Sequence, residues 1–371
     1  MKRRVACAFG AALLSGSLIG HLHAQAATAR MHVEAARAAV APKGADPKKT
    51  PPFHIFQALF DQTCQEPKLP DVMRTNDRSA VVPRKEWFAW PANIFDNLYF
   101  IGTRTAGVWA VNTSEGIIVI DANFHYSSRE LVLGLLNFGL DPNNIRYVII
   151  THAHDDRYWG AKALQDSYPK ARIAMSAADW DLVAKDNSPA AFKPRRDMVV
   201  TDGQTITLGG VTVTAYVTPG HTPGTLSLIV GPLTNQKSVA SDDGKYVASI
   251  WGGVDASIGR HGVQYYPDGQ TMMRTHVASL RRFMDLSRKA GADVVLTPTL
   301  RHMNFQEKLR AWRYMNPDES GGGNPDGVLG QWLKLKDAAH PFVSREAVDR
   351  HYTVLLECYE AQLAWRTGSE R

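Results

Sequence analysis

Two histidines separated by a single residue are the first feature of this sequence that could carry out metal chemistry. His152 and His154 directly follow the apolar run at 147–150, which predicts a buried strand. Side chains two positions apart on an extended backbone point the same way, so both imidazoles can face one ion. Asp156 follows where the chain turns away, and its carboxylate can bind a second metal or orient a metal-bound water.

A third nitrogen ligand is expected from a turn further along the chain. His221 lies between the pairs Pro219-Gly220 and Pro223-Gly224, in a turn that joins predicted strands at 211–217 and 226–230. Such a tight turn fixes the direction of the ring and keeps it at the end of the sheet. Three neutral imidazoles with one open position form the arrangement of catalytic zinc sites. Zinc in such a site lowers the pKa of its bound water to about 7 and so supplies hydroxide at neutral pH.

The rest of the chain alternates short strands with helices, and these elements must hold the histidine segments at one edge. Further strands are predicted at 98–101, 108–111, 116–121, 172–175, 198–200, 205–208, 246–250 and 294–296. Helices are predicted at 127–136, 161–167, 177–185, 271–290 and 345–365. Two halves of similar order predict an α/β fold in which two packed sheets carry helices on their outer faces. The stretch 316–330, with three consecutive glycines, predicts a flexible loop.

Composition fits a soluble globular protein, with 44% hydrophobic and 21% charged residues among 371. Residues 1–26 have a basic start, a short apolar segment and a small-residue close, the pattern of a secretory signal peptide rather than a stable membrane anchor. We therefore expect a periplasmic or secreted protein. Loss of Lys2, Arg3 and Arg4 would lower the formal charge from +6 to +3, since 6 − 3 = 3. That charge argues against a nucleic-acid partner and leaves a small-molecule substrate as the expectation.

The signal peptide is followed by a predicted flexible leader at 27–52 and one folded domain at 53–371. The leader is rich in Ala, Lys and Pro and has little apolar patterning. After cleavage the mature chain keeps Cys64 and Cys358. In an oxidising compartment the two could pair, and two separate buried thiols are the alternative. The oligomeric state stays open.

These motifs closely resemble the metallo-β-lactamase superfamily, from about Phe53 onward. The resemblance rests on the segment 97–102, Ile120-Asp121, the His-x-His-x-Asp segment and Gly-His-Thr-Pro-Gly at 220–224. It implies a four-layer αβ/βα sandwich with the metal site at one edge of the two sheets. Among exported bacterial members, the third β-lactamase subclass (B3) is the most similar. Asp121 ends a strand beside the site, where it can accept a hydrogen bond from a ligand imidazole and fix its tautomer.

Three departures from that subclass concern the second metal. Arg157 stands where a metal-binding histidine follows the aspartate, and a guanidinium cannot donate to a metal. Thr299 stands where a late histidine should be, and His302 comes three residues later. His302 could act as a ligand or be a loop histidine, and Asp255 could act as a ligand or be a loop carboxylate. We therefore expect one zinc, and two only if His302 or Asp255 contributes.

The predicted function is zinc-dependent hydrolysis of a cyclic amide or ester by a metal-bound hydroxide, with a β-lactam as the first substrate to test. Asp156 would hold the water and relay its proton. Arg157 would polarise the substrate carbonyl, bind a substrate carboxylate, or pair with Asp155 or Asp156. The alternatives are a hydrolase of another ester class, such as a lactone or thioester, and a catalytically weak zinc- or ligand-binding protein.

Overall fold

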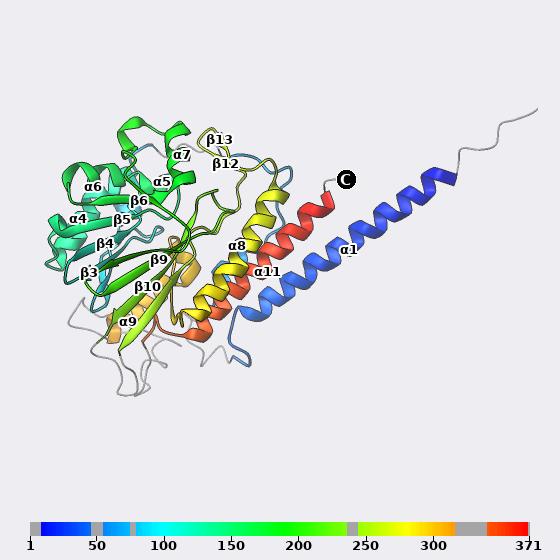
Figure 1. The fold of residues 1–371 in the computed structure, drawn as a ribbon. Coiled ribbons are helices and arrows are strands. Elements are labelled where there is room, and N and C mark those ends of the chain that lie inside the picture. Colours follow the sequence, from blue (N-terminus) through cyan, green and yellow to red (C-terminus); the bar gives the residue numbers. More distant parts are fainter. Residues whose placement is uncertain (1–8, 46–54, 75–78, 236–243, 316–339, 370–371) are drawn as a thin grey trace, which may run out of the picture.

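The computed structural model describes residues 9–45, 55–74, 79–235, 244–315 and 340–369. Helices and strands alternate around two main sheets that pack face to face (Figure 1). The loop predicted at 316–330 lies outside the described residues.

The first sheet has seven strands in chain order. Its first four strands form an antiparallel meander, and the rest add in parallel. The parallel strands are apolar runs, as expected where both faces of a sheet are covered. In order they are β1 (Ala92–Phe95), β2 (Leu98–Phe100), β3 (Trp109–Thr113), β4 (Gly116–Ile120), β5 (Ile145–Ile149), β6 (Arg172–Ser176) and β7 (Met198–Val200).

The second sheet has five strands in the order β14-β11-β10-β9-β8, and only β14 pairs in parallel. These strands are β8 (Gln204–Leu208), β9 (Val211–Val217), β10 (Leu226–Thr234), β11 (Lys245–Ile250) and β14 (Val294–Leu296). A small separate hairpin is formed by β12 (Gly259–Arg260) and β13 (Val263–Gln264).

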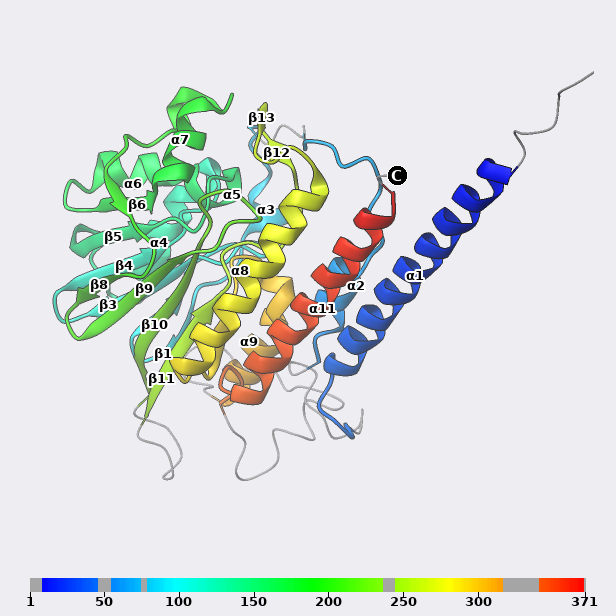
Figure 2. The ribbon, with the colours of Figure 1, turned by 45° about the vertical axis from the view of Figure 1, so that its right-hand side comes forward.

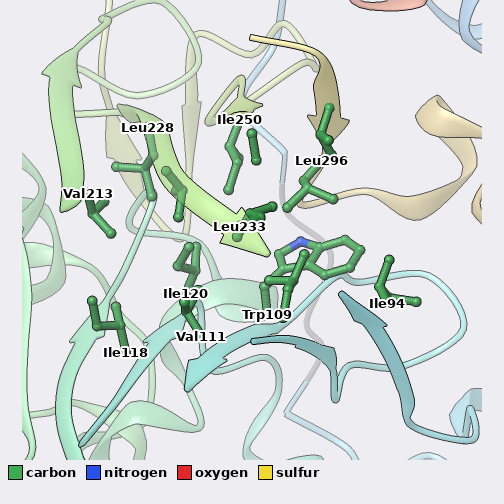
Figure 3. Packing of buried hydrophobic residues seen from close by; sticks show 14 of the residues in the cluster. Ile94, Trp109, Val111, Ile118, Ile120, Val213, Leu228, Leu233, Ile250 and Leu296 are labelled. Carbon is green, nitrogen blue, oxygen red and sulfur yellow. The ribbon is translucent and has the colours of Figure 1, made fainter. Parts of the chain in front are cut away.

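Apolar side chains from both sheets fill the space between them. Ile118, Ile120 and Trp109 of the first sheet face Leu228 and Ile250 of the second (Figure 3). These residues are almost completely buried. Because successive side chains of a strand point to opposite faces, the other face of each sheet is apolar too and must be covered by helices.

The outer layers supply that cover. The first sheet is covered by α4 (Ser128–Asn137), α6 (Ala161–Ser167) and α7 (Ala177–Lys185), and the second by α8 (Gly269–Lys289) and α11 (Arg345–Ser369) (Figures 1 and 2). Asp268 caps α8 by accepting from the backbone N–H of Thr271. The predicted four-layer αβ/βα sandwich is confirmed.

Several smaller elements were not predicted. They include β1, the β12–β13 hairpin, α3 (Arg84–Trp87), α5 (Asp155–Tyr158) and α9 (Phe305–Met315). The α5 helix is a single turn, too short to leave a helical periodicity in the sequence. The α9 helix packs its buried face against the core between the sheets, through Phe305, Leu309 and Trp312.

The predicted flexible leader is wrong in its first half. Helix α1 (Phe9–Ala39) continues through it and packs along α11, as both ribbon views show (Figures 1 and 2). Ala29 and Ala36 are fully buried there, and His32 Nδ1 lies 2.6 Å from a carboxylate oxygen of Glu357. Alanines favour a helix and, because they are small, let it approach its neighbour closely. No helix among the described residues is both long and apolar enough to cross a membrane.

The side chains of Cys64 and Cys358 form a disulfide bond. Cys64 directly follows α2 (Gln57–Thr63), and Cys358 lies on α11, 294 positions later. The disulfide thus attaches the beginning of the domain to its final helix, and it settles the alternative that the sequence left open.

Candidate metal centre

Three histidines meet at the edge where the two sheets approach each other. His152 and His154 follow β5, and His221 lies in the turn between β9 and β10. The backbone N–H of Leu226 donates to the carbonyl of Thr151 at 2.7 Å, which joins the two histidine loops directly. The ligand atoms of the three rings all lie within 4.8 Å of one another. The structure thus brings together the three residues that the sequence predicted as zinc ligands.

Backbone carbonyls determine which ring nitrogens face the centre. His152 Nδ1 donates to the carbonyl of Gly252 at 2.7 Å, and His221 Nδ1 donates to that of Asp255 at 2.5 Å. The Nε2 atoms of these two rings, 3.1 Å apart, each carry a lone pair when the rings are neutral. Two lone pairs cannot hydrogen-bond to each other, whereas a cation between them would satisfy both. The donor set therefore fits a zinc ion.

Burial keeps these rings neutral. It lowers the pKa of His152 and of His154 well below the usual value, and that of His221 to about 4. His154 Nδ1 lies 3.0 Å from His221 Nε2, and its own Nε2 is buried with no hydrogen-bond partner. Neutral imidazole is the form that binds metal, so the site is ready to accept an ion at neutral pH.

A buried aspartate that was not among the predicted site residues ties the two histidine loops together. Asp179 in α7 accepts from the N–H of Ala153, the hydroxyl of Thr222 and the N–H of Gly224, at 2.7 to 2.8 Å. Burial raises its pKa to about 6, although these donors oppose the shift. Gly224 fits because a Cβ there would overlap Asp179 and Ser176. The sequence signal was an aspartate near the start of a helix, which by itself is an ordinary feature.

Asp121 does not contact a ligand imidazole, so the predicted hydrogen bond is wrong. Its carboxylate accepts instead from the N–H and hydroxyl of Thr151, at 2.8 to 3.0 Å. Burial raises the pKa of Asp121 to about 7, and the charge of Arg157 opposes that shift. The backbone of Asp121 has a φ of 63°, which turns its side chain back toward the end of β5. It therefore supports the residue before His152 rather than the ring itself.

Arg157 lies among the groups that the B3 resemblance associates with a second metal. It is buried, and its guanidinium forms an ion pair with Asp156 at 3.0 Å. It also donates to the carbonyl of Pro298 at 2.6 Å and to the hydroxyl of Thr299 at 3.2 Å. A fixed positive charge therefore lies beside Asp156 and Thr299. Of the expected roles of Arg157, the ion pair with Asp156 is present.

His302 and Asp255 do not join the three-histidine group. His302 Nε2 lies 2.5 Å from the side-chain oxygen of Gln62, and burial lowers the pKa of His302 to about 4. The short helix after β14 turns its ring toward α2, so the predicted metal-ligand role of His302 has no support in the geometry. Asp255 forms an ion pair with Arg74 at 3.2 Å and uses its backbone carbonyl to hold His221. It is a loop carboxylate.

The three histidines open into a pocket of about 460 Å³. Asp156 and Arg157 line it together with apolar groups and three more arginines: Ala80, Val82, Phe124, Tyr126, Val254, Arg74, Arg260 and Arg301. A buried metal-binding group at the wall of an accessible pocket is the usual arrangement of an active site.

Comparisons with known proteins agree with this geometry. Residues 102–232 match the family model described as Metallo-beta-lactamase superfamily. BJP-1, a subclass B3 metallo-beta-lactamase of Bradyrhizobium japonicum, superposes with a TM-score of 0.57 at 22% identity, covering 76% of this chain and 97% of that one. A metallo-beta-lactamase from Cronobacter sakazakii with a HARLDQ motif gives 0.57 at 20% identity, covering 82% and 98%. The chain therefore contains a segment that matches the metallo-β-lactamase superfamily, and it has the fold of the B3 metallo-β-lactamases.

Curated relatives match over shorter stretches. A hydroxyacylglutathione hydrolase of Acidiphilium cryptum is 42% identical over 85 residues, which are 23% of this chain and 30% of that protein. A probable polyketide biosynthesis zinc-dependent hydrolase, BaeB of Bacillus velezensis, is 35% identical over 77 residues, 21% and 31% of the two chains. The chain spans less than two thirds of the length of these relatives.

Proposed function

We propose that this protein is a zinc-dependent hydrolase of a cyclic amide or ester, with a β-lactam as the first substrate to test. The observation that carries the proposal is the convergence of three buried, neutral imidazoles on one point of an accessible pocket. His152, His154 and His221 would hold the ion. When bound, zinc polarises a substrate carbonyl and makes a coordinated water acidic.

The protein groups beside the ion supply orientation and proton transfer. The carboxylate of Asp156 lines the pocket and, at a position next to the histidines, is suited to hold the attacking water and accept its proton. Arg157 fixes that carboxylate through their ion pair. Because its nitrogens also donate to Pro298 and Thr299, we assign Arg157 to positioning Asp156 rather than to binding the substrate.

We propose one zinc per chain. A second cation near Asp156 would face the fixed charge of Arg157, which is buried and therefore weakly screened. Within the parts of the chain that the structure describes, the three histidines form a metal-binding group that includes neither His302 nor Asp255.

We further propose that the protein works outside the cytoplasm. The basic and apolar start of the sequence supports this, and so does the disulfide between Cys64 and Cys358, since such bonds persist in oxidising compartments. The measurement is the N-terminal sequence of protein recovered from the periplasm of a bacterial host. Recovery of the uncleaved chain from the cytoplasm would contradict the proposal.

The central test combines metal content with turnover. Wild-type protein should contain about one zinc per chain and hydrolyse a chromogenic cephalosporin, and His221→Ala should lose both. The matched control is His32→Ala, which removes a histidine of α1 that pairs with Glu357. A His221→Ala variant that keeps its zinc and its turnover would refute the site.

A thioester is the second substrate class to test. The hydroxyacylglutathione hydrolase of Acidiphilium cryptum is 42% identical over the stretch that matches, compared with 35% for BaeB. Hydrolysis of lactoylglutathione, with no turnover of the cephalosporin, would move the assignment to a thioesterase. Zinc binding without turnover of either compound, or of a simple lactone, would identify a zinc-binding protein instead.

A further inference from the structure

Four arginines line the pocket, and three of them have a carboxylate partner. Arg74 pairs with Asp255 at 3.2 Å, Arg157 with Asp156 at 3.0 Å and Arg260 with the fully buried Asp155 at 2.8 Å. A guanidinium that is already paired has less of its charge left for a ligand. We therefore assign these three arginines a structural role in the wall of the pocket.

Arg301 differs from the other three. It is exposed at the pocket, and its Nε donates to the side-chain oxygen of Gln62, a neutral amide, at 2.6 Å. Among the described residues no ion pair joins it to a carboxylate. Its charge is thus uncompensated by its protein neighbours in the described part of the chain.

Arg301 is also held in place. The same oxygen of Gln62 lies 2.5 Å from His302 Nε2, so one amide anchors two successive side chains of the loop after β14. Gln62 belongs to α2, which the disulfide from Cys64 fastens to α11. Since the anchor uses Nε, the two terminal nitrogens of the guanidinium are left to bind a ligand. A guanidinium whose position is fixed loses less entropy when it binds a planar anion.

The pocket also offers apolar surface. The rings of Phe124 and Tyr126 stack with their centroids 5.1 Å apart, and Val82 lines the same pocket. One uncompensated cation together with aromatic surface matches a molecule that carries both an anionic and an apolar group. A guanidinium can form two parallel hydrogen bonds to a carboxylate, a sulfonate or a phosphate.

We propose that Arg301 binds the anionic group of the substrate, so that the substrate class is an anionic amide or ester with an apolar substituent. The substrate class rests on the proposed hydrolase function, whereas the binding of an anion by Arg301 does not. The sequence left open whether Arg157 binds a substrate carboxylate or pairs with a neighbouring aspartate. Because Arg157 is paired with Asp156, we assign the binding of the anionic group to Arg301.

Binding of three matched fluorescent probes tests the proposal without any turnover. Dansylglycine carries a carboxylate, dansyltaurine a sulfonate, and dansylglycinamide is neutral. The full-length protein should bind at least one of the two anions about tenfold or more tightly than the amide, with and without added zinc. Arg301→Gln should abolish that preference and leave the affinity for the amide unchanged. Whichever of the two anionic probes binds more tightly identifies the type of anionic group that the site prefers.

Two further variants separate the role of Arg301 from a general effect of charge. Arg345→Gln removes an exposed arginine at the start of α11, outside the pocket lining, and should bind the probes like wild type. Gln62→Glu places a carboxylate beside the Nε of Arg301. The new ion pair, like those of the other three pocket arginines, should leave less of the charge for a ligand and so weaken anion binding. Equal affinity for all three probes, or an anion preference that survives in Arg301→Gln, would overturn the proposal.

Kinetics then distinguish this proposal from the hydrolase assignment. With a chromogenic cephalosporin, Arg301→Gln should raise KM about tenfold and change kcat less than threefold, while a methyl ester of the same compound shows no change. If the protein turns over neither compound, the hydrolase proposal fails, while the probe measurements still decide whether Arg301 binds anions.

Discussion

Each histidine of the centre has one nitrogen that faces the ion site, and for two of them the loop after β11 determines which nitrogen it is. The carbonyls of Gly252 and Asp255 hold the protons of His152 and His221 on Nδ1. Placing two lone pairs face to face costs free energy in a buried site unless an ion lies between them. The same loop therefore positions the rings and favours an ion between them.

The charge of Arg157 should limit the number of metal ions that the site binds. Arg157→His removes the fixed charge, and Thr299→His adds a candidate ligand three residues after the end of β14. The double variant should approach two zinc ions per chain, whereas Thr299→His alone should stay at about one because the guanidinium remains. Zinc per chain, measured by mass spectrometry after dialysis, is the readout. A double variant that stays at one zinc, or a wild-type protein with two, would contradict this account.

Among the elements, the loop after β11 packs directly against a histidine of the site. A Cβ at Gly253 would overlap the ring of His221. The same ring donates from Nδ1 to the backbone carbonyl of Asp255, two residues further along this loop. The loop can therefore hold that ring only if residue 253 is glycine.

Gly253→Ala should weaken zinc binding about tenfold or more, since groups that orient metal ligands typically contribute 10- to 100-fold in affinity. Competition with a chelator measures the change. Ala256→Ser, a small substitution in the same loop, is the control and should bind zinc like wild type. Unchanged affinity in a folded Gly253→Ala protein would show that the loop adapts without cost.

For the molecule as a whole, the disulfide closes a covalent loop that contains most of the chain. Cys64 and Cys358 are separated by 294 positions, and closing so long a loop stabilises the folded state by roughly 5–6 kcal/mol, because it restricts the unfolded chain. The double variant Cys64→Ser/Cys358→Ser should lose about this free energy of unfolding in urea. Reducing agent should have the same effect on wild type and none on the variant. Equal unfolding midpoints for wild type and variant would refute the prediction.

A buried lysine makes the stability of the protein depend on pH. Lys308 of α9 is almost fully buried, with its Nζ 5.6 Å from the ring centre of Phe342. Burial is the main cause that lowers its pKa from 10.5 to about 7, and the charge of Arg350 adds to it. Between these two values the unfolded chain binds more protons than the folded one. Stability from this group therefore rises as the pH increases from about 7 to 10.5.

Lys308→Met keeps the apolar stem and removes the charge. At pH 7 we expect a gain on the order of 2–4 kcal/mol in the free energy of unfolding, shrinking as the pH approaches 10. Urea unfolding at pH 7 and pH 9.5 measures both values. The same gain at both pH values, or a loss at pH 7, would contradict the assignment of this pKa.

Local sequence determined the elements and the ligands of the proposed centre. The apolar run that precedes His152 forms a strand because both of its faces are buried, and the Pro-Gly pairs around His221 form a turn. Several predicted bounds match the structure, including those of α6, α7 and β9. These features depend on interactions between residues close in the chain, which is why the sequence reveals them.

Tertiary structure alone decided what each charged side chain contacts. Asp179 joins the two histidine loops, His302 turns toward Gln62, and Arg301 is left without a carboxylate partner among the described residues. The leader became a helix because α11 offered it a surface to pack on. Such contacts join residues tens to hundreds of positions apart, and the free energy of an ion pair or a buried helix face depends on the partner that the fold supplies.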